Sequence, residues 1–291
     1  MDGGKFLQCS HAPEAQHCPL PSSNWLVGIL RPIVGPPAGF LAIRDAVQKA
    51  IDDMLRHGIK PAALIVDSIF SSDGVLPDPA GFLGGAVEAI RAAGGLFISD
   101  EVQPGFARTG SHMWGFQRHG VVPDMVSLGK PMGNGYPVAG LVVRPDVVEE
   151  FGRKARYFNT FGGNTVAIAV ASAVLDVIES EGLMENAATV GAYLAAGLRD
   201  LATRFPVIGE VRGAGLFLGV EMVKDRLSRE PDTDTAVEAV NGLREKGVLI
   251  SATGPDANIL KIRPALVFTR ANADFFVDKL EQVLTGVNEG R

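Results

Sequence analysis

Short apolar runs alternate with helix-like segments between residues 62 and 143. Four runs have the length and composition of buried β-strands, at 62–69, 96–100, 125–128 and 138–143. The stretch 79–93 has helical character, with Asp78 placed to cap it and Gly94 just behind it. Strands that are apolar throughout and are joined through a helix are typical of parallel sheets covered on both faces. This pattern predicts an α/β fold with a mostly parallel sheet.

The second half of the chain has a different texture. Residues 165–179 are almost continuously apolar, which predicts a helix buried on most sides, and a second long helix is expected over 183–204. Strand-like runs follow at 207–212, 215–222, 248–251 and 259–263, with helices expected over 234–246 and 272–284. We therefore expect three parts: an irregular segment over 1–39, a major domain over 40–175 and a smaller α+β domain over 176–291.

The charge balance restricts the class of partner. The 291 residues include 27 Lys and Arg against 33 Asp and Glu, a formal net charge of -6. An acidic balance argues against nucleic acid or an anionic membrane as the partner, because both need a basic patch. No apolar run reaches membrane-spanning length, and the first residues do not follow the order of a secretory signal. We expect a cytoplasmic protein that acts on small molecules.

Cys9 and Cys18 are the two cysteines of the chain. Two cysteines in a chain of this length do not make a disulfide framework. His11 and His17 lie between them, but the segment has no Cys-x-x-Cys pair. We expect no metal site there and a reducing compartment.

Two of the predicted strands lead into ionisable side chains. The strand at 96–100 ends at Asp100, and Lys130 closely follows the strand at 125–128. In an open α/β sheet, ligands bind beyond the carboxyl ends of the strands. A lysine there is expected to be partly desolvated, which favours the neutral amine that forms imines. On placement alone, the simpler interpretation is structural: the lysine reaches solvent, and the aspartate caps the next turn or pairs with Arg108.

A series of motifs connects these strand ends. It comprises DEVQPGFARTG at 100–110, PDM at 123–125, SLGK at 127–130, GNGYP at 133–137, NTFGGN at 159–164, RGAGL at 212–216 and LKIRP at 260–264. In this order the series resembles the class III aminotransferases, which are pyridoxal phosphate (PLP) enzymes of fold type I. The resemblance covers roughly residues 40–291. It implies a fold type I α/β architecture, PLP as the cofactor and a homodimer.

The resemblance also implies roles for five residues. Lys130 would hold PLP as a Schiff base, and Asp100 would face the pyridine nitrogen, where a carboxylate stabilises the protonated ring. Gln103 would bond the 3′ oxygen of the ring. Thr160 would reach the phosphate, in the family usually that of a neighbouring subunit. Arg263 resembles the arginine that receives a substrate carboxylate in its planar fork.

Three of these residues also have a simpler structural interpretation. Gln103 can pair with the backbone of its own loop, and Thr160 can cap the helix that starts near Asn164. Arg263 can serve as an ion-pair partner within the smaller domain. The sequence alone leaves these alternatives open.

The chain departs from the family pattern ahead of the strand at 62–69. Family members carry there a Ser-Gly-Thr/Ser loop at a helix N-terminus, which binds the cofactor phosphate. They also carry an aromatic residue next to a histidine, which stacks on the PLP ring. Residues 1–39 contain neither motif, so we expect the N-terminal portion of the family to be missing and the sheet to be incomplete. Such a chain is expected to expose an unpaired sheet edge and apolar faces.

A local variation indicates a branch of the family. The segment DSIFSSDG at 67–74 replaces the Glu-Pro-Val/Ile-Gln-Gly pattern of many class III aminotransferases. Together with VLISA at 248–252 and the Arg263 segment, it looks closer to the alanine–glyoxylate aminotransferase 2-like branch. Some members of that branch are phospho-lyases that act on phosphorylated amino alcohols.

The resemblance implies transfer of an amino group from an amine or amino acid to a keto acid, with Lys130 as the acid/base group. One alternative is a PLP-dependent phospho-lyase reaction on a phosphorylated amino alcohol. The other is an inactive, truncated chain, or one that acts as the assembly partner of a complementary fragment.

Overall fold

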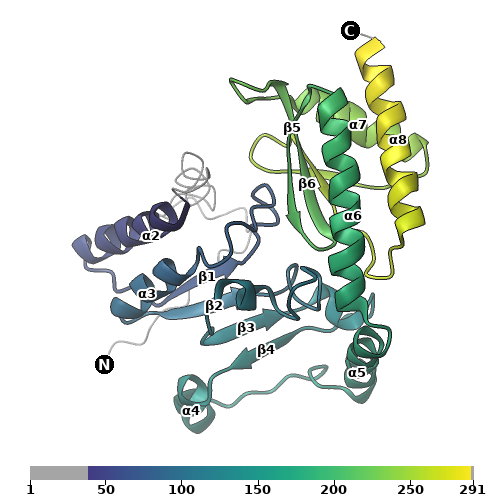
Figure 1. Cartoon of the computed structure of the whole chain (residues 1–291). Helices are drawn as coiled ribbons and strands as arrows, with labels where there is room; N and C mark the ends of the chain where they lie inside the picture. Colours follow the sequence, from purple (N-terminus) through teal and green to yellow (C-terminus); the bar gives the residue numbers. More distant parts are fainter. Residues whose placement is uncertain (1–38, 290–291) are drawn as a thin grey trace, which may run out of the picture.

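The larger lobe of the molecule is built on a four-stranded sheet. The computed structural model describes residues 39–289. The sheet contains β1 (Ala63–Asp67), β2 (Leu96–Asp100), β3 (Met125–Leu128) and β4 (Gly140–Val143) in the order β1-β2-β3-β4 (Figure 1). The first three strands are parallel and β4 runs antiparallel to β3. The α/β fold with a mostly parallel sheet is thereby confirmed.

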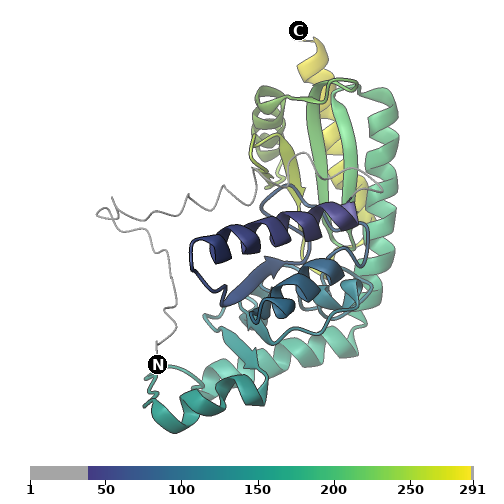
Figure 2. The same ribbon diagram turned by 90° about the vertical axis from the view of Figure 1, so that its left-hand side faces the viewer.

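Two helices pack near the β1 end of this sheet, α2 (Gly39–Arg56) and α3 (Gly84–Ala92), and Figure 2 shows α2 in front of the lobe. They share an apolar cluster with β1 and β2 that includes Ile51, Phe82, Ile90 and Phe97. The expected helix over 79–93 was wrong at its start. Gly81 has a φ of 92°, a left-handed conformation that interrupts helical backbone, so the helix begins only at Gly84.

The smaller lobe contains an antiparallel sheet covered by helices. Its strands are β5 (Ile208–Ala214), β6 (Phe217–Asp225), β9 (Ile259–Ile262) and β8 (Ser251–Thr253) in the order β5-β6-β9-β8, and β7 (Glu230–Pro231) pairs with β6. The strand expected at 248–251 therefore starts at its last residue. The helices are α6 (Leu183–Arg204), α7 (Thr233–Glu245) and α8 (Arg270–Glu289).

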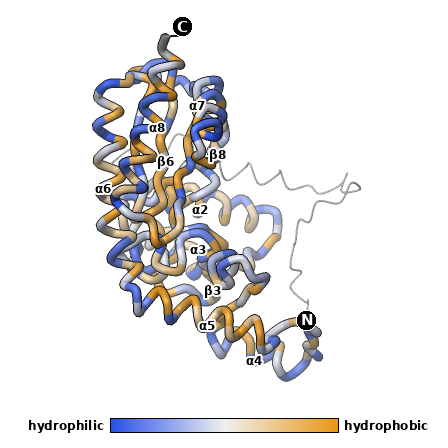
Figure 3. The backbone as a smooth tube through the Cα atoms, turned by 90° about the vertical axis from the view of Figure 1, so that its right-hand side faces the viewer, coloured by the Kyte–Doolittle hydropathy of each residue, from blue (hydrophilic) through white to orange (hydrophobic). Residues whose placement is uncertain are grey.

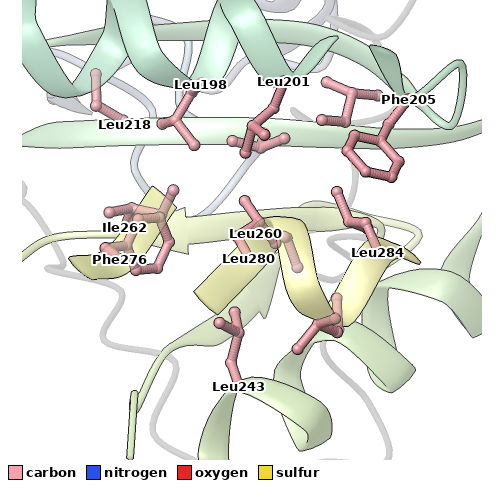
Figure 4. Packing of buried hydrophobic residues seen from close by; sticks show 14 of the residues in the cluster. Leu198, Leu201, Phe205, Leu218, Leu243, Leu260, Ile262, Phe276, Leu280 and Leu284 are labelled. Carbon is pink, nitrogen blue, oxygen red and sulfur yellow. The ribbon is translucent and has the colours of Figure 1, made fainter. Parts of the chain in front are cut away.

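The main hydrophobic core fills the space between this sheet and its helices. Leu198 and Leu201 of α6 meet Leu218 of β6, while Leu260 of β9 packs toward Leu280 of α8 (Figure 4). All five side chains are almost completely buried. The α+β character of this lobe agrees with the expectation from the sequence, and the domain boundary near residue 175 stays a prediction.

Helix α5 (Thr165–Ser180) has an apolar sequence but an exposed surface. It contacts α6 and the turn η2 (Lys130–Gly133), and it buries Ala167, Ala171 and Ile178. Four of its larger apolar side chains are exposed, namely Val166, Ile168, Leu175 and Val177, and Figure 3 shows the helix as mostly hydrophobic. The expectation of a helix buried on most sides was therefore wrong for this chain, because composition does not specify what covers a helix.

The apolar surface continues along the chain before α5. The segment between α4 (Pro145–Lys154) and α5 exposes Tyr157, Phe158 and Phe161, and α4 exposes Phe151. Contiguous exposed apolar surface of this kind usually marks an interaction site. No helix within residues 39–289 combines the length and apolar character that crossing a membrane requires.

Candidate active site

The carboxyl ends of β1, β2 and β3 lie at one edge of the larger sheet. In the parallel register Asp67 is paired with Asp100, and Asp100 with Ser127. Lys130 follows three residues after Ser127 and opens the turn η2. The topology therefore places the two predicted residues Asp100 and Lys130 at neighbouring strand ends, on the edge where ligands bind in open α/β sheets.

Asp100 is held by local hydrogen bonds through one of its two oxygens. Its Oδ1 accepts a bond from the backbone N–H of Val102 at 3.1 Å and one from the Ser127 hydroxyl at 3.2 Å. No described residue donates a hydrogen bond to its Oδ2. Arg108 is not its partner, since that guanidinium donates to the carbonyls of Leu216, at 3.2 Å, and Pro264. One carboxylate oxygen is thus fixed and the other is available.

Lys130 is exposed, so the expectation of partial desolvation was wrong for this structure. The side chain starts at the edge of the sheet, and no element within residues 39–289 covers it. Its backbone has a φ of 41°, in the left-handed region that non-glycine residues rarely occupy. In the described part of the chain its Nζ has neither a hydrogen bond nor an ion pair. Such strained backbone often occurs at functional sites.

Gln103 joins the loop after β2 to the loop after β1. Its Nε2 donates to the hydroxyls of Ser71 and Ser72, the second at 3.4 Å. Ser71 in turn donates two hydrogen bonds to the Asp67 carboxylate. One comes from its hydroxyl and the other, at 2.9 Å, from its backbone N–H. The alternative interpretation, in which Gln103 pairs with the backbone of its own loop, was wrong, because its amide bonds serine hydroxyls of the loop after β1. Gln103 lies at the same sheet edge as Asp100.

Thr160 lies in the exposed segment between α4 and α5. It does not cap α5, because the N-cap is Asn164, whose Oδ1 accepts the N–H of Ala167 at 2.9 Å. The capping interpretation was wrong. Nothing in the described residues brings Thr160 against Asp100 or Lys130.

Arg263 follows β9 directly and is exposed. It forms no ion pair with any described residue, so the ion-pair interpretation is not supported. Its charge contributes to the low pKa of Arg108, which burial lowers to about 10. The structure therefore brings Arg263 near Arg108, which bonds the carbonyl of the residue after Arg263.

The smaller sheet is attached to the strand ends of the larger one. The Arg212 guanidinium donates to the carbonyls of Gly74 and Val75, each at 3.0 Å, and the Thr253 hydroxyl donates to Ser72 O at 2.9 Å. Gly215 has a φ of 55°, and a Cβ there would lie 2.6 Å from Arg108 O. This close approach of the turn between β5 and β6 to the loop after β2 explains Gly215, the second glycine of the RGAGL motif.

Comparison with known proteins identifies the family. The family model Aminotransferase class-III matches residues 41–284. The chain belongs to the class III aminotransferases. The fold type I resemblance drawn from the motifs is thereby confirmed.

Two curated relatives of this class III chain have different activities in their names. It is 43% identical over 247 residues to an alanine–glyoxylate aminotransferase 2-like protein of Drosophila melanogaster, covering 84% of this chain and 50% of the relative. It is 40% identical over 247 residues to the ethanolamine-phosphate phospho-lyase homolog 1 of Caenorhabditis elegans, covering 84% and 53%. The chain thus spans about half the length of these relatives.

Solved structures of the class III fold superimpose well on the chain. A phospholyase from Arthrobacter in complex with phosphoethanolamine gives a TM-score of 0.81 at 41% identity, covering 86% of this chain and 60% of the other. An aminotransferase from Bacillus anthracis gives 0.78 at 33% identity, covering 84% and 56%. These likenesses confirm the α/β architecture and the enzyme family.

The sequence pattern did not draw attention to Lys261, which the class III fold buries. It lies in β9 between the core residues Leu260 and Ile262, and its exposed fraction is 9%. A lysine flanked by apolar residues inside a strand was the available signal. As for metals, no three described His, Cys, Asp or Glu residues are arranged as ligands, and Cys9 and Cys18 lie outside the described residues.

His119 is a buried neutral imidazole that contacts the loop after β1 through Ser68. Its Nδ1 accepts the Gly81 N–H at 3.1 Å and its Nε2 donates to Ser68 O at 2.9 Å. Burial lowers its pKa to about 4. The unfolded chain therefore binds the proton first as the pH falls, and stability is lost between the unfolded pKa of about 6.5 and the folded value of about 4.

We expect the free energy of unfolding to drop by about 2 kcal/mol through His119 between about pH 7 and about pH 5. Urea unfolding at both pH values measures this. The His119→Gln variant retains an amide donor and acceptor but has no group that titrates. It should be less stable at neutral pH and show a smaller loss on acidification. An equal loss in both proteins would contradict the assignment.

Proposed function

We propose that this chain carries the PLP site of a class III aminotransferase and transfers an amino group from an amine or amino acid to a keto acid. The observation that carries the proposal is the placement of Asp100 and Lys130 at adjacent carboxyl ends of β2 and β3. Lys130 would anchor PLP and Asp100 would pair with its ring nitrogen. Gln103 would bond the 3′ oxygen, Thr160 the phosphate bound to a neighbouring subunit, and Arg263 a substrate carboxylate.

The described residues fit this cofactor. Asp100 is fixed through Oδ1, which leaves Oδ2 for a cationic ring N–H. The Lys130 amine forms no ion pair with a carboxylate in the described part of the chain. When bound, PLP supplies the electron sink that stabilises negative charge on the substrate carbon.

Three side chains of the protein would then take part in the chemistry, those of Lys130, Asp100 and Arg263. The Lys130 amine takes a proton from the substrate carbon and returns it at a second position, as a general acid/base does. Asp100 holds a negative charge whose position is fixed before the reaction begins, which avoids reorganisation. Arg263 orients an anionic substrate through two parallel hydrogen bonds.

A phospho-lyase reaction is the second candidate. The Arthrobacter phospholyase supports it, because that structure contains phosphoethanolamine and is 41% identical to this chain. Both reactions begin with removal of a proton by the lysine. They differ in the next step, which is return of the proton or loss of the phosphate group.

The two candidates are separated by their products. The purified chain with added PLP is incubated with an amine donor and a keto acid, and separately with phosphoethanolamine alone. Amino transfer that requires the keto acid, without release of inorganic phosphate, is the expected result. Phosphate release without a keto acid would establish the lyase instead. If neither product forms until a complementary N-terminal fragment is added, the chain acts as an assembly partner.

A homodimer belongs to the same proposal. The exposed apolar side chains of α4, α5 and the segment between them support it, because a second subunit would cover them. Thr160 lies in that segment, which suits a residue that serves the neighbouring subunit's phosphate. The cytoplasmic location stays a prediction, and relatives from Arabidopsis thaliana and Homo sapiens are named mitochondrial.

A further inference from the structure

Gln103 is held by a chain of hydrogen bonds that begins at Asp67, at the carboxyl end of β1. The Asp67 carboxylate accepts the N–H groups of Ile69 at 3.1 Å and of Ser71 at 2.9 Å, and it also accepts the Ser71 hydroxyl. Gln103 then donates from Nε2 to the same Ser71 oxygen. A single, fully buried hydroxyl therefore connects the carboxylate at one strand end to the amide in the loop after the next strand.

The direction of each bond in this chain follows from the protons that are available. Burial raises the pKa of Asp67, and the three donors oppose that rise because they stabilise the ionised carboxyl, which can only accept. Ser71 has one hydroxyl proton, and its bond to Asp67 uses it. The Ser71 oxygen can therefore only accept from residue 103. An amide meets that requirement with its NH2 end, because its carbonyl end has no proton to donate.

The backbone places the Ser71 hydroxyl independently of Gln103. Phe70 is buried and has a φ of 46°, in the left-handed region that non-glycine residues rarely occupy. Its N–H donates to Asp67 O at 3.0 Å, and its carbonyl accepts the N–H of Val75 at 3.0 Å. These bonds, together with the N–H of Ser71 on the Asp67 carboxylate, do not involve the hydroxyl. Removal of the hydroxyl is therefore expected to leave the loop in place.

The neighbouring serine does not impose the same direction. Ser72 is exposed, and its hydroxyl oxygen lies 3.4 Å from Nε2 of Gln103, longer than the usual N–H···O distance of about 2.9 Å. Within the described residues its hydroxyl donates to no carboxylate, so it can turn either its proton or a lone pair toward Gln103. Ser72 is thus a matched control for Ser71.

We propose that Asp67 and Ser71 are positioning residues, which fix the Gln103 amide so that its NH2 end serves the cofactor. The inference rests on the proposed role of Gln103 at the 3′ oxygen of PLP. One of the two amide protons bonds Ser71. The other makes only the long contact to Ser72 among the described residues, which leaves it for an anionic ring oxygen. A reversed amide would present its carbonyl to that oxygen and repel it.

The first measurement uses the full chain without cofactor. Selective ¹⁵N labelling of the six glutamines gives each a pair of side-chain N–H signals, and the Gln103→Leu variant identifies the pair of Gln103. One Gln103 proton should exchange with water about twofold to tenfold more slowly than those of the exposed Gln48, as one hydrogen bond allows. Ser71→Ala should remove this protection and Ser72→Ala should retain it.

Asp67→Asn tests whether the direction begins at the carboxylate. Three donors would then share one carbonyl oxygen, so the Ser71 hydroxyl would no longer have to donate to residue 67. The protection of the Gln103 proton should fall, although Asp67 has no hydrogen bond to Gln103 in the described structure.

The second measurement follows the visible band of the chain with bound PLP as the pH is raised. The negative ring oxygen favours the protonated form of the Lys130 Schiff base, and an N–H donated to that oxygen weakens this effect. Ser71→Ala should therefore raise the pKa of the Schiff base by about 0.5 to 1, which corresponds to the loss of one hydrogen bond. Ser72→Ala should leave this pKa unchanged.

Thermal unfolding separates positioning from structure. Loss of one hydrogen bond should lower the Tm of Ser71→Ala by about 2–4 °C. A lower Tm with an unchanged Schiff-base pKa would show a structural role alone and overturn the proposal. Protection that survives in Ser71→Ala, or that Ser72→Ala removes equally, would also overturn it. A chain that shows the expected protection but binds no PLP would keep the assigned amide orientation and refute the proposed function.

Discussion

Lys130→Ala is expected to abolish covalent attachment of PLP and to remove the chemistry that depends on it. Lys130 is the lysine at the carboxyl edge of the larger sheet, next to the strand that ends in Asp100. Alanine has no amine to form the bond to the cofactor. Loss of the proton-transfer group alone costs about 10²-fold to 10⁴-fold in rate. The measurement is the visible absorbance band of the protein with added PLP, fixed by borohydride reduction and located by peptide mapping.

Two matched variants make this result specific. Lys154→Ala removes an exposed lysine from α4, with 75% of its side chain accessible, and should leave the band unchanged. Lys130→Arg keeps the positive charge and should still lose the band, because a guanidinium does not lose its proton in proteins. A labelled peptide that maps to another lysine, or a band that survives in Lys130→Ala, would refute the assignment.

Asp100→Asn is expected to leave PLP attached while slowing the reaction by about tenfold to a thousandfold. An opposite charge typically shifts the pKa of its partner by 1–3 units, and each unit corresponds to a factor of ten in an equilibrium or rate. The asparagine amide retains an oxygen for the N–H of Val102 and the hydroxyl of Ser127, so the loop geometry is preserved. What is lost is the negative charge facing the ring nitrogen. Single-turnover rates with the bound cofactor measure the effect.

The specificity of the Asp100 result can be checked at Asp146. That aspartate is exposed at the start of α4 and pairs with Arg144, so Asp146→Asn should not change the rate. Asp100→Glu restores the charge on a longer side chain and should recover part of the activity. An Asp100→Asn protein with the unsubstituted rate would show that the ring nitrogen has another partner.

Local patterns predicted those elements whose boundaries depend on nearby residues. Helix α6 occupies 183–204 as expected, because Gly182 provides a left-handed start and Phe205-Pro206 ends the helix. Helix α3 shows the limit of such reasoning. The candidate cap Asp78 instead pairs with Arg118 at 2.8 Å, a contact between residues 40 positions apart that no local pattern contains.

The sequence by itself determined the α/β class, the carboxyl ends of β2 and β3 and the placement of Asp100 and Lys130 beside them, because apolar runs and motif order are local properties of the chain. The tertiary structure decided the rest. It left Val166, Ile168, Leu175 and Val177 of α5 exposed, paired Arg108 with backbone carbonyls and gave Gln103 its serine partners. It also buried Lys261, whose environment comes from β1, β6 and β9 together. Burial and pairing of these groups depend on segments far apart in the chain, and only folding brings such segments into contact.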